Sequence, residues 1–150
     1  MSLVSDIPPA SAADVEARYL QRLAFETDCS DVWNSIRTGA ADFVLIDIRG
    51  PKLYEAGHIP GAVNLPHGKI TASRMETWPT DTLFVVYCAG PHCNGTDRAA
   101  LRLARLERKV KVMIGGVTGW ADEQLPLVTG DEAGSVLQVA AGTSPSNEGR

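Results

Sequence analysis

Residues 82–104 read Thr82-Leu-Phe-Val-Val-Tyr-Cys88-Ala-Gly-Pro-His-Cys93-Asn-Gly-Thr-Asp-Arg98-Ala-Ala-Leu-Arg-Leu-Ala104. The run Leu83–Tyr87 is short, apolar and rich in β-branched and aromatic residues, which is typical of a buried strand. After a loop with two glycines, a proline and two cysteines, a helix is predicted from about Asp97 to Glu107, with Thr96 or Asp97 as its cap. The stretch therefore predicts a thiol that follows a strand and faces the N-terminus of a helix.

This position predicts a thiol that ionises easily. The free N–H groups of a first helical turn carry partial positive charge, and a thiol beside them loses its proton more readily. Gly90, Asn94 and Gly95 would let the loop curl so that further amides point inward, and Arg98 would add a fixed cation. Such a ring would hold a small oxyanion or a persulfide. The alternative, on these residues alone, is an inert buried thiol that fills the core.

Length and composition restrict the class of protein. A chain of 150 residues with 44% hydrophobic residues predicts one domain with a real core. A net charge of −4 argues against general binding to nucleic acid. No apolar run reaches about 18 residues, so no membrane span is expected. The N-terminus lacks the pattern of a secretory signal, and three cysteines make no disulfide framework, so a cytoplasmic location is expected.

Predicted strands alternate with predicted helices, which indicates a parallel α/β sheet with right-handed crossovers. The expected strands are 25–29, 42–47, 62–65, 83–87 and 110–114. The expected helices between them are 31–37 with Ser30 as its cap, 51–56, 68–76, 97–107 and 117–124. These elements predict an N-terminal extension over residues 1–24, a domain over residues 25–130 and a flexible tail over residues 131–150.

The N-terminal extension is predicted to contain an amphipathic helix over residues 11–23. Ser11 is a suitable N-cap, because Asp14 follows three residues later as in a capping box. Val15, Tyr19 and Leu23 fall on one face of this helix. That face is expected to cover the sheet or to form a contact in a homodimer, and docking of another partner is the alternative.

Four motifs follow one another along the chain: Leu45-Ile-Asp47-Ile-Arg49, Tyr54-Glu-Ala-Gly-His58-Ile-Pro60-Gly61-Ala62, Val85-Val-Tyr-Cys88 and Ile114-Gly115-Gly116-Val-Thr-Gly119-Trp120. In this order and spacing they resemble the rhodanese-like sulfurtransferase family over about residues 25–128. The resemblance implies a rhodanese-like parallel five-stranded sheet flanked by helices on both faces. It implies Cys88 as the catalytic nucleophile and a substrate-binding loop that includes Gly90, His92, Cys93, Asn94, Gly95, Thr96 and Arg98.

The same resemblance implies a structural role for three polar residues. Asp47, Arg49 and His58 are expected to hold loops together through hydrogen bonds and an ion pair, since most buried polar groups satisfy one another. An acid–base pair is the alternative. Cys29 lies far from the loop in sequence and is expected to be structural.

The loop departs from the family pattern, and this leaves two candidates for the nucleophile. Cys93-Asn-Gly-Thr-Asp-Arg98 has the six-residue length of the family loop, whereas the loop counted from Cys88 is longer. The preceding strand and the spacing to Gly115 favour Cys88. Cys93 could then be a resolving thiol or a bystander. Cys88, His92 and Cys93 are a weak zinc pattern, so no metal is expected.

The resemblance implies a sulfurtransferase that needs no cofactor. A donor such as thiosulfate, a small sulfur-containing anion, would leave a persulfide on Cys88, and a thiol or protein acceptor would take the sulfur. One alternative is an arsenate reductase or phosphatase-like enzyme of the same fold, although Tyr87 stands where those enzymes usually have His. The other is a non-catalytic persulfide carrier or binding module. No nucleic acid or membrane partner is expected.

Overall fold

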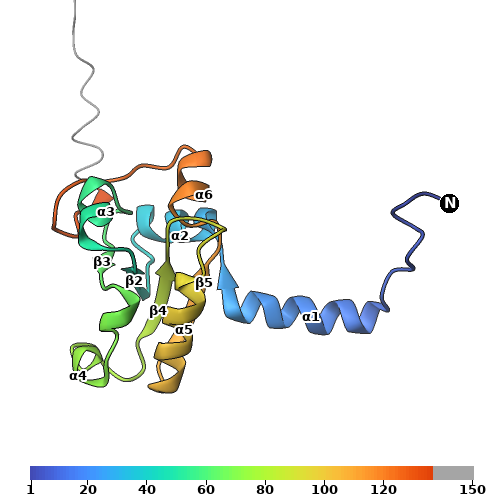
Figure 1. Cartoon of the computed structure of the whole chain (residues 1–150), viewed down its shortest axis with the longest axis horizontal. Helices are drawn as coiled ribbons and strands as arrows, with labels where there is room; N and C mark the ends of the chain where they lie inside the picture. The colour runs from blue at the N-terminus through green and yellow to red at the C-terminus, as the bar shows by residue number, and fades with distance from the viewer. Residues whose placement is uncertain (137–150) are drawn as a thin grey trace, which may run out of the picture.

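The protein is described here by a computed structural model that covers residues 1–136. It contains a five-stranded parallel sheet, as the sequence predicts, and the order of its strands is β1-β5-β4-β2-β3. The strands are β1 (Glu26–Thr27), β2 (Phe43–Asp47), β3 (Val63–Asn64), β4 (Leu83–Tyr87) and β5 (Lys109–Met113). The first strand therefore lies at one edge of the sheet and pairs with the last strand (Figure 1).

Helices flank both faces of the sheet and connect its strands (Figure 1). They are α1 (Ala12–Phe25), α2 (Cys29–Arg37), α3 (Pro51–Ala56), the short 3₁₀ helix η1 (His67–Lys69), α4 (Ala72–Met75), α5 (Gly95–Arg105) and α6 (Gly116–Asp122). Among residues 1–136, no helix combines the length and the apolar character needed to cross a bilayer.

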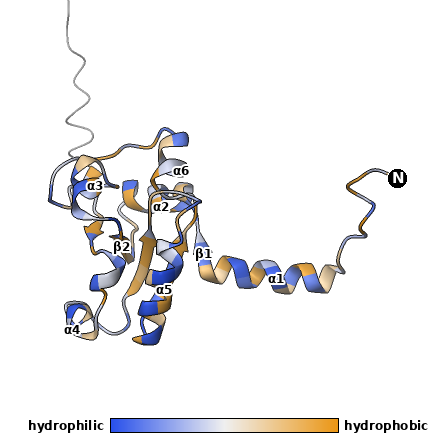
Figure 2. Ribbon diagram, viewed as in Figure 1, coloured by the Kyte–Doolittle hydropathy of each residue, from blue (hydrophilic) through white to orange (hydrophobic). Residues whose placement is uncertain are grey.

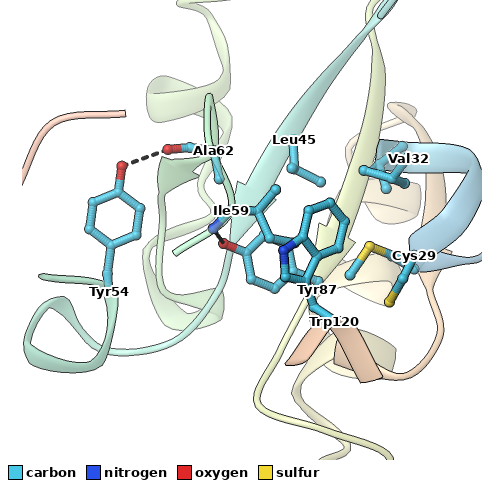
Figure 3. Close-up of a cluster of buried hydrophobic side chains, with 10 residues drawn as sticks. Cys29, Val32, Leu45, Tyr54, Ile59, Ala62, Tyr87 and Trp120 are labelled. Atoms are coloured by element: carbon cyan, nitrogen blue, oxygen red, sulfur yellow. Dashed lines mark hydrogen bonds between the residues drawn. The ribbon is translucent and has the colours of Figure 1, made fainter. Parts of the chain in front are cut away.

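The core has two halves, one on each face of the sheet, because side chains alternate along a strand. Phe84 and Val86 of β4 pack with Ala99 and Leu103 of α5. Val85 and Tyr87 of β4 enter the other half, with Cys29, Val32, Leu45, Tyr54, Ile59, Ala62, Met113 and Trp120 (Figure 3). Hydropathy follows this arrangement, since β4 is apolar along its length while α5 is polar on its outer side (Figure 2).

Buried polar groups in this core have hydrogen-bond partners. The Tyr87 hydroxyl accepts from the Ile59 amide at 3.1 Å, and the Tyr54 hydroxyl donates to the Ala62 carbonyl at 2.6 Å (Figure 3). These bonds tie the loop after α3 to the sheet, which fixes the edge of the sheet where β2 and β4 end.

Asp47, Arg49 and His58 hold loops together, as predicted. The Asp47 carboxylate is fully buried and pairs with the Arg49 guanidinium at 2.7 Å. Arg49 also donates to the Gly57 carbonyl at 2.6 Å. The two ring nitrogens of His58 lie 2.8 Å from the Tyr54 carbonyl and 3.1 Å from the Ala133 carbonyl. Each group is therefore engaged within the scaffold.

The chain beyond α6 also contacts this region. Val128 and His58 exchange backbone hydrogen bonds, and the Ala133 carbonyl accepts from the Gly61 amide at 2.8 Å. Ala133 falls within the tail predicted over residues 131–150, so the described part of that segment is bonded to the domain. Residues 137–150 lie outside the described residues.

The position of α1 differs from the prediction. Its N-cap is as expected, since the Ser11 hydroxyl accepts from the Asp14 amide. The helix nevertheless projects away from the domain and has no buried residue (Figure 1). Leu20 is 62% exposed and Leu23 is 68% exposed. The expectation that this helix covers the sheet is therefore wrong. Apolar residues that recur at helical spacing identify an apolar face of a helix, but they do not show what that face contacts.

Several element boundaries also differ from the prediction. The strand expected over residues 25–29 is limited to Glu26–Thr27, because Phe25 ends α1 and Cys29 begins α2. The predicted helix 68–76 consists of η1 and α4, separated at Ile70, which is 3% exposed and packs in the core. The cap of α2 is Asp28 rather than Ser30, because its carboxylate accepts from the Asp31 amide at 2.8 Å. Finally, α5 begins at Gly95, two residues earlier than expected.

Candidate functional site

Cys88 follows β4 directly, at the carboxyl edge of the sheet where α/β folds bind ligands. The start of α6 is packed against this position. The Cys88 carbonyl accepts from the Val117 amide at 3.0 Å, and the Ala89 carbonyl accepts from the Thr118 amide at 2.9 Å. Gly116 has a φ of +61°, and a Cβ there would lie 2.6 Å from the Cys88 carbonyl oxygen. The glycine pair of the last motif is therefore required for this close approach.

The loop after β4 brings Cys93 back beside Cys88. A turn is closed by the Cys93 amide, which donates to the Gly90 carbonyl at 3.2 Å. The Gly95 amide, in the first turn of α5, then donates to the Cys93 sulfur at 3.3 Å. A Cβ on Gly95 would lie 3.1 Å from the sulfur of Cys88 and 3.2 Å from that of Cys93. Both sulfurs thus border the same small space at the N-terminus of α5.

The two thiols have opposite acidity. Burial, followed by a hydrogen bond to Cys93, raises the pKa of Cys88 to about 11. The pKa of Cys93 is lowered by the hydrogen bond from Cys88 and by the Gly95 and Ala89 amides. The prediction of an acidic thiol at Cys88 is therefore wrong, because burial outweighs the nearby amide. Cys93 is therefore the more acidic of the two thiols, since its pKa is lowered while that of Cys88 is raised, and it is also more exposed than Cys88.

A cavity of about 230 Å³ opens over both cysteines. It is lined by Glu26, Cys88, Gly90, Pro91, Cys93, Thr96, Asp97, Val112, Met113, Ile114, Gly115 and Gly116. Its lining includes two carboxylates and no Lys or Arg side chain. Backbone amides are thus the positive groups of the lining itself, and Glu26 is paired with Arg22 at 2.8 Å. The Arg49 guanidinium lies outside the lining, but its charge interacts with Cys88.

The predicted loop residues are only partly brought together. Gly90, Cys93 and Thr96 line the cavity. Gly95 faces both cysteine sulfurs and leaves room for them, because it has no side chain. His92 and Asn94 are exposed and lie outside its lining.

Arg98 does not reach the cavity that contains the cysteines. Its guanidinium bonds to the Asn94 side chain at 3.3 Å and lines a separate cavity of about 390 Å³ between α5 and η1. The role of a fixed cation beside the thiol, expected for Arg98, is therefore not fulfilled in this structure.

Glu26 and Asp97 are the residues of this site that sequence reasoning missed. Glu26 lies in β1, on the far edge of the sheet from β2 and β3, and it reaches the site because β1 pairs with β5. That strand order is not visible in the sequence. In the sequence, Asp97 is an acidic residue in the first turn of the predicted helix, and that position predicts only a role as a helix cap.

Comparisons with known proteins agree with this geometry. The family model described as a rhodanese-like domain matches residues 28–123. The chain is similar to the protein BH2092 of Bacillus halodurans, whose crystal structure superimposes with a TM-score of 0.77 at 30% identity. That match covers 85% of this chain and 93% of the other.

Two curated relatives of this chain are named for different functions, one for transcriptional regulation and one for sulfur transfer. The HTH-type transcriptional regulator Rv0324 of Mycobacterium tuberculosis is 36% identical over 99 residues, which are 65% of this chain and 43% of that protein. Thiosulfate sulfurtransferase GlpE of Pseudoalteromonas translucida is 34% identical over 79 residues, which are 53% of this chain and 73% of that protein. The chain spans less than two thirds of the length of the first curated relatives that it matches.

Proposed function

The chain belongs to the rhodanese-like domain family, and from this membership we propose that it is a sulfurtransferase that carries sulfane sulfur on Cys88. The observation that carries the proposal is the position of Cys88. Its sulfur follows β4 at the ligand-binding edge of the sheet, borders the N-terminus of α5 and lines a cavity. Relatives that are named sulfurtransferases support the same class of reaction.

The neighbouring thiolate explains how a buried thiol with a raised pKa can react. Cys88 is hydrogen-bonded to Cys93, whose thiolate is stabilised by the Gly95 amide. Cys93 therefore accepts the proton of Cys88 as a general base when the donor arrives. Burial makes the resulting Cys88 thiolate poorly solvated and strongly nucleophilic, so proton transfer and attack are coupled.

The reaction then proceeds in two half-reactions. The Cys88 thiolate attacks the outer sulfur of thiosulfate, the S–S bond of the donor breaks, and sulfite leaves with the electron pair. A Cys88 persulfide remains in the cavity, where the helix amides stabilise its charge. A thiophilic acceptor, cyanide in an assay or a thiol in the cell, attacks the outer sulfur and regenerates the Cys88 thiolate.

The charge of the cavity bears on the choice of donor. Glu26 and Asp97 line the same space as the cysteines, and like charges at close range raise the free energy of a bound anion. We therefore expect thiosulfate, a dianion, to bind weakly, with a high KM. An organic persulfide with a neutral organic group carries one negative charge instead of two, so it is repelled less and should load the protein at a lower concentration.

The test is a steady-state and mass-spectrometric assay of the full chain. Thiosulfate with cyanide should give thiocyanate with ping-pong kinetics, and loaded protein should be heavier by one sulfur atom on the Cys88 peptide. Cys88→Ser should abolish both signals, whereas Cys29→Ala, which alters a thiol outside the cavity, should retain both. Absence of both thiocyanate formation and the adduct, with thiosulfate and with an organic persulfide as donor, would refute the proposal. A stable adduct without turnover would indicate a persulfide carrier instead.

A further inference from the structure

We propose that this domain has a second activity, the release of hydrosulfide from its own persulfide, in which Cys93 resolves Cys88 and a Cys88–Cys93 disulfide forms. The proposal rests on the proposed sulfurtransferase function, because it begins from the Cys88 persulfide. It assigns a chemical role to the one other cysteine that lines the cavity.

The first argument is proximity. The turn between Gly90 and Cys93 folds the loop back, so that both sulfurs border the position where a Gly95 side chain would stand. The two sulfurs lie 3.1 and 3.2 Å from that position, so they are close neighbours across it. Only four residues separate the two cysteines, so the loop between them is short enough for a disulfide to be tested directly.

The third cysteine provides a contrast within the same chain. Cys29 is buried in the other half of the core, and its sulfur faces the carbonyls of Ile114 and Gly116 at 3.5 and 3.8 Å (Figure 3). Burial raises the pKa of Cys29 to about 11. It is outside the cavity and stays protonated at neutral pH, so it is unsuited to attack a persulfide.

The second argument is the exposure and the acidity of the Cys93 thiol. Its sulfur is partly exposed, and the Gly95 amide donates a hydrogen bond to it. A resolving thiol must be ionised and accessible, and these are the properties by which Cys93 differs from Cys88. After Cys93 has accepted the proton of Cys88 during loading, its exposure allows that proton to return to solvent. Cys93 is then ready for a second step.

The resolving step balances without an external oxidant. The Cys93 thiolate attacks the inner sulfur, which is the Cys88 sulfur, and the bond from that sulfur to the sulfane sulfur breaks. Hydrosulfide leaves with the electron pair and takes up a proton according to pH. The sulfane sulfur is reduced by two electrons, and the two cysteines are oxidised together to a disulfide.

A second turnover requires the disulfide to be reduced. The co-reactant is a dithiol, which exchanges with the Cys88–Cys93 bond through a mixed disulfide and leaves as a cyclic or intramolecular disulfide. Cys93 is the accessible sulfur and therefore the expected point of attack. The complete cycle consumes one sulfane sulfur and one dithiol, and it releases one hydrosulfide.

The experiment separates this step from loading. Reduced full-length protein is loaded with an organic persulfide, freed of donor and incubated without thiol. Wild-type protein should release sulfide, measured colorimetrically, and should become lighter than the reduced protein by two hydrogen atoms. Peptide mapping should locate the bond between Cys88 and Cys93. Cys93→Ser should keep the added sulfur on Cys88 and release sulfide at least tenfold more slowly, whereas Cys29→Ala should behave as wild type.

A second arm does not depend on sulfur loading. Wild-type protein and Cys29→Ala are equilibrated in glutathione redox buffers, and the Cys88–Cys93 disulfide is quantified by mass. Failure of this disulfide to form under oxidising conditions overturns the resolving role even where Cys88 loads normally. Sulfide release by Cys93→Ser at the wild-type rate overturns it as well. Absence of both sulfide release and any adduct in wild type, with the Cys88–Cys93 disulfide formed normally in the redox buffers, refutes the persulfide chemistry and leaves a dithiol of another function.

Discussion

Two identical functional groups acquire opposite properties in this site because of small differences in position. Cys88 ends a central strand and is 7% exposed, so burial disfavours its thiolate. Cys93 lies five residues later, at the opening of the cavity, where the amides of Gly95 and Ala89 favour the charged form. The ionisation of each thiol therefore depends on that of the other, although one sulfur is buried and the other is accessible.

Gly95 sets the distance between these sulfurs and the helix. We predict that Gly95→Ala lowers kcat/KM for sulfur transfer at least tenfold, because its Cβ would lie within 3.2 Å of both sulfurs and 3.0 Å from the Ile48 side chain. Overpacking of this kind should lower the free energy of unfolding by about 1–3 kcal/mol. Gly68→Ala, where a Cβ meets no atom within 4 Å, is the matched control. Unchanged activity in Gly95→Ala would show that the sulfurs do not need this spacing.

The sequence predicted the position of Cys88 and the engagement of Asp47, Arg49 and His58, because these follow from strand ends and motif spacing. It did not predict which thiol is acidic. That outcome depends on a balance between burial and amide hydrogen bonds, which is set by the folded loop and not by the local sequence. The direction of Arg98 was missed for a similar reason, since a long side chain at a helix start can turn toward either side of the helix.

At the scale of elements, local signals placed the central strands well and the peripheral helices less well. The predicted strand 83–87 coincides with β4, because a short apolar run between turn residues has few other interpretations. The helix over residues 11–23 was also found, since Ser11 and Asp14 mark its start. The sequence did not predict how this helix lies relative to the sheet, because that arrangement depends on surfaces that are distant in sequence.

The contrast between α1 and α6 leads to a prediction about stability. Trp120 of α6 is fully buried, packs edge-on against Trp33 and donates to the Pro126 carbonyl at 2.9 Å. We expect Trp120→Ala to lower the free energy of unfolding by about 3–5 kcal/mol. Leu20→Ala in α1 should change it by less than about 0.5 kcal/mol, because that side chain is exposed. Urea denaturation measures both values, and a large loss in Leu20→Ala would mean that α1 is docked in solution.

For the whole molecule, several buried groups depend on remaining uncharged. Burial raises the pKa of Cys29 and of Cys88 to about 11, and it raises that of Tyr54 to about 12. In the unfolded chain these thiols would ionise near 9.0. Their contribution to folding is therefore complete below about pH 9 and is lost as the pH rises toward 11. The contribution of Cys93 to the free energy of unfolding depends on pH with the opposite sign. Because the pKa of Cys93 is lowered, this contribution increases as the pH rises toward 9.0.

We predict an alkaline loss of stability that is steeper than the surface charges alone would produce. The free energy of unfolding should change little between pH 7 and 9 and should fall between pH 9 and 11, by up to roughly 2–3 kcal/mol from the buried Cys29 thiol. Cys29→Ala should reduce the slope over this range, whatever its effect on stability at pH 7. Equal slopes in wild type and Cys29→Ala would contradict the assignment of a buried neutral thiol at this position.

The pairing of the first strand with the last has a consequence for how the protein is made. Glu26 and Thr27 align with Val112 and Met113, so the edge strand acquires its neighbour only after most of the domain has been translated. A nascent chain on the ribosome can form the β2–β4 pair much earlier. We therefore infer that β1 remains unpaired during synthesis until β5 has left the ribosome, and that it joins the sheet after the β2–β4 pair has formed.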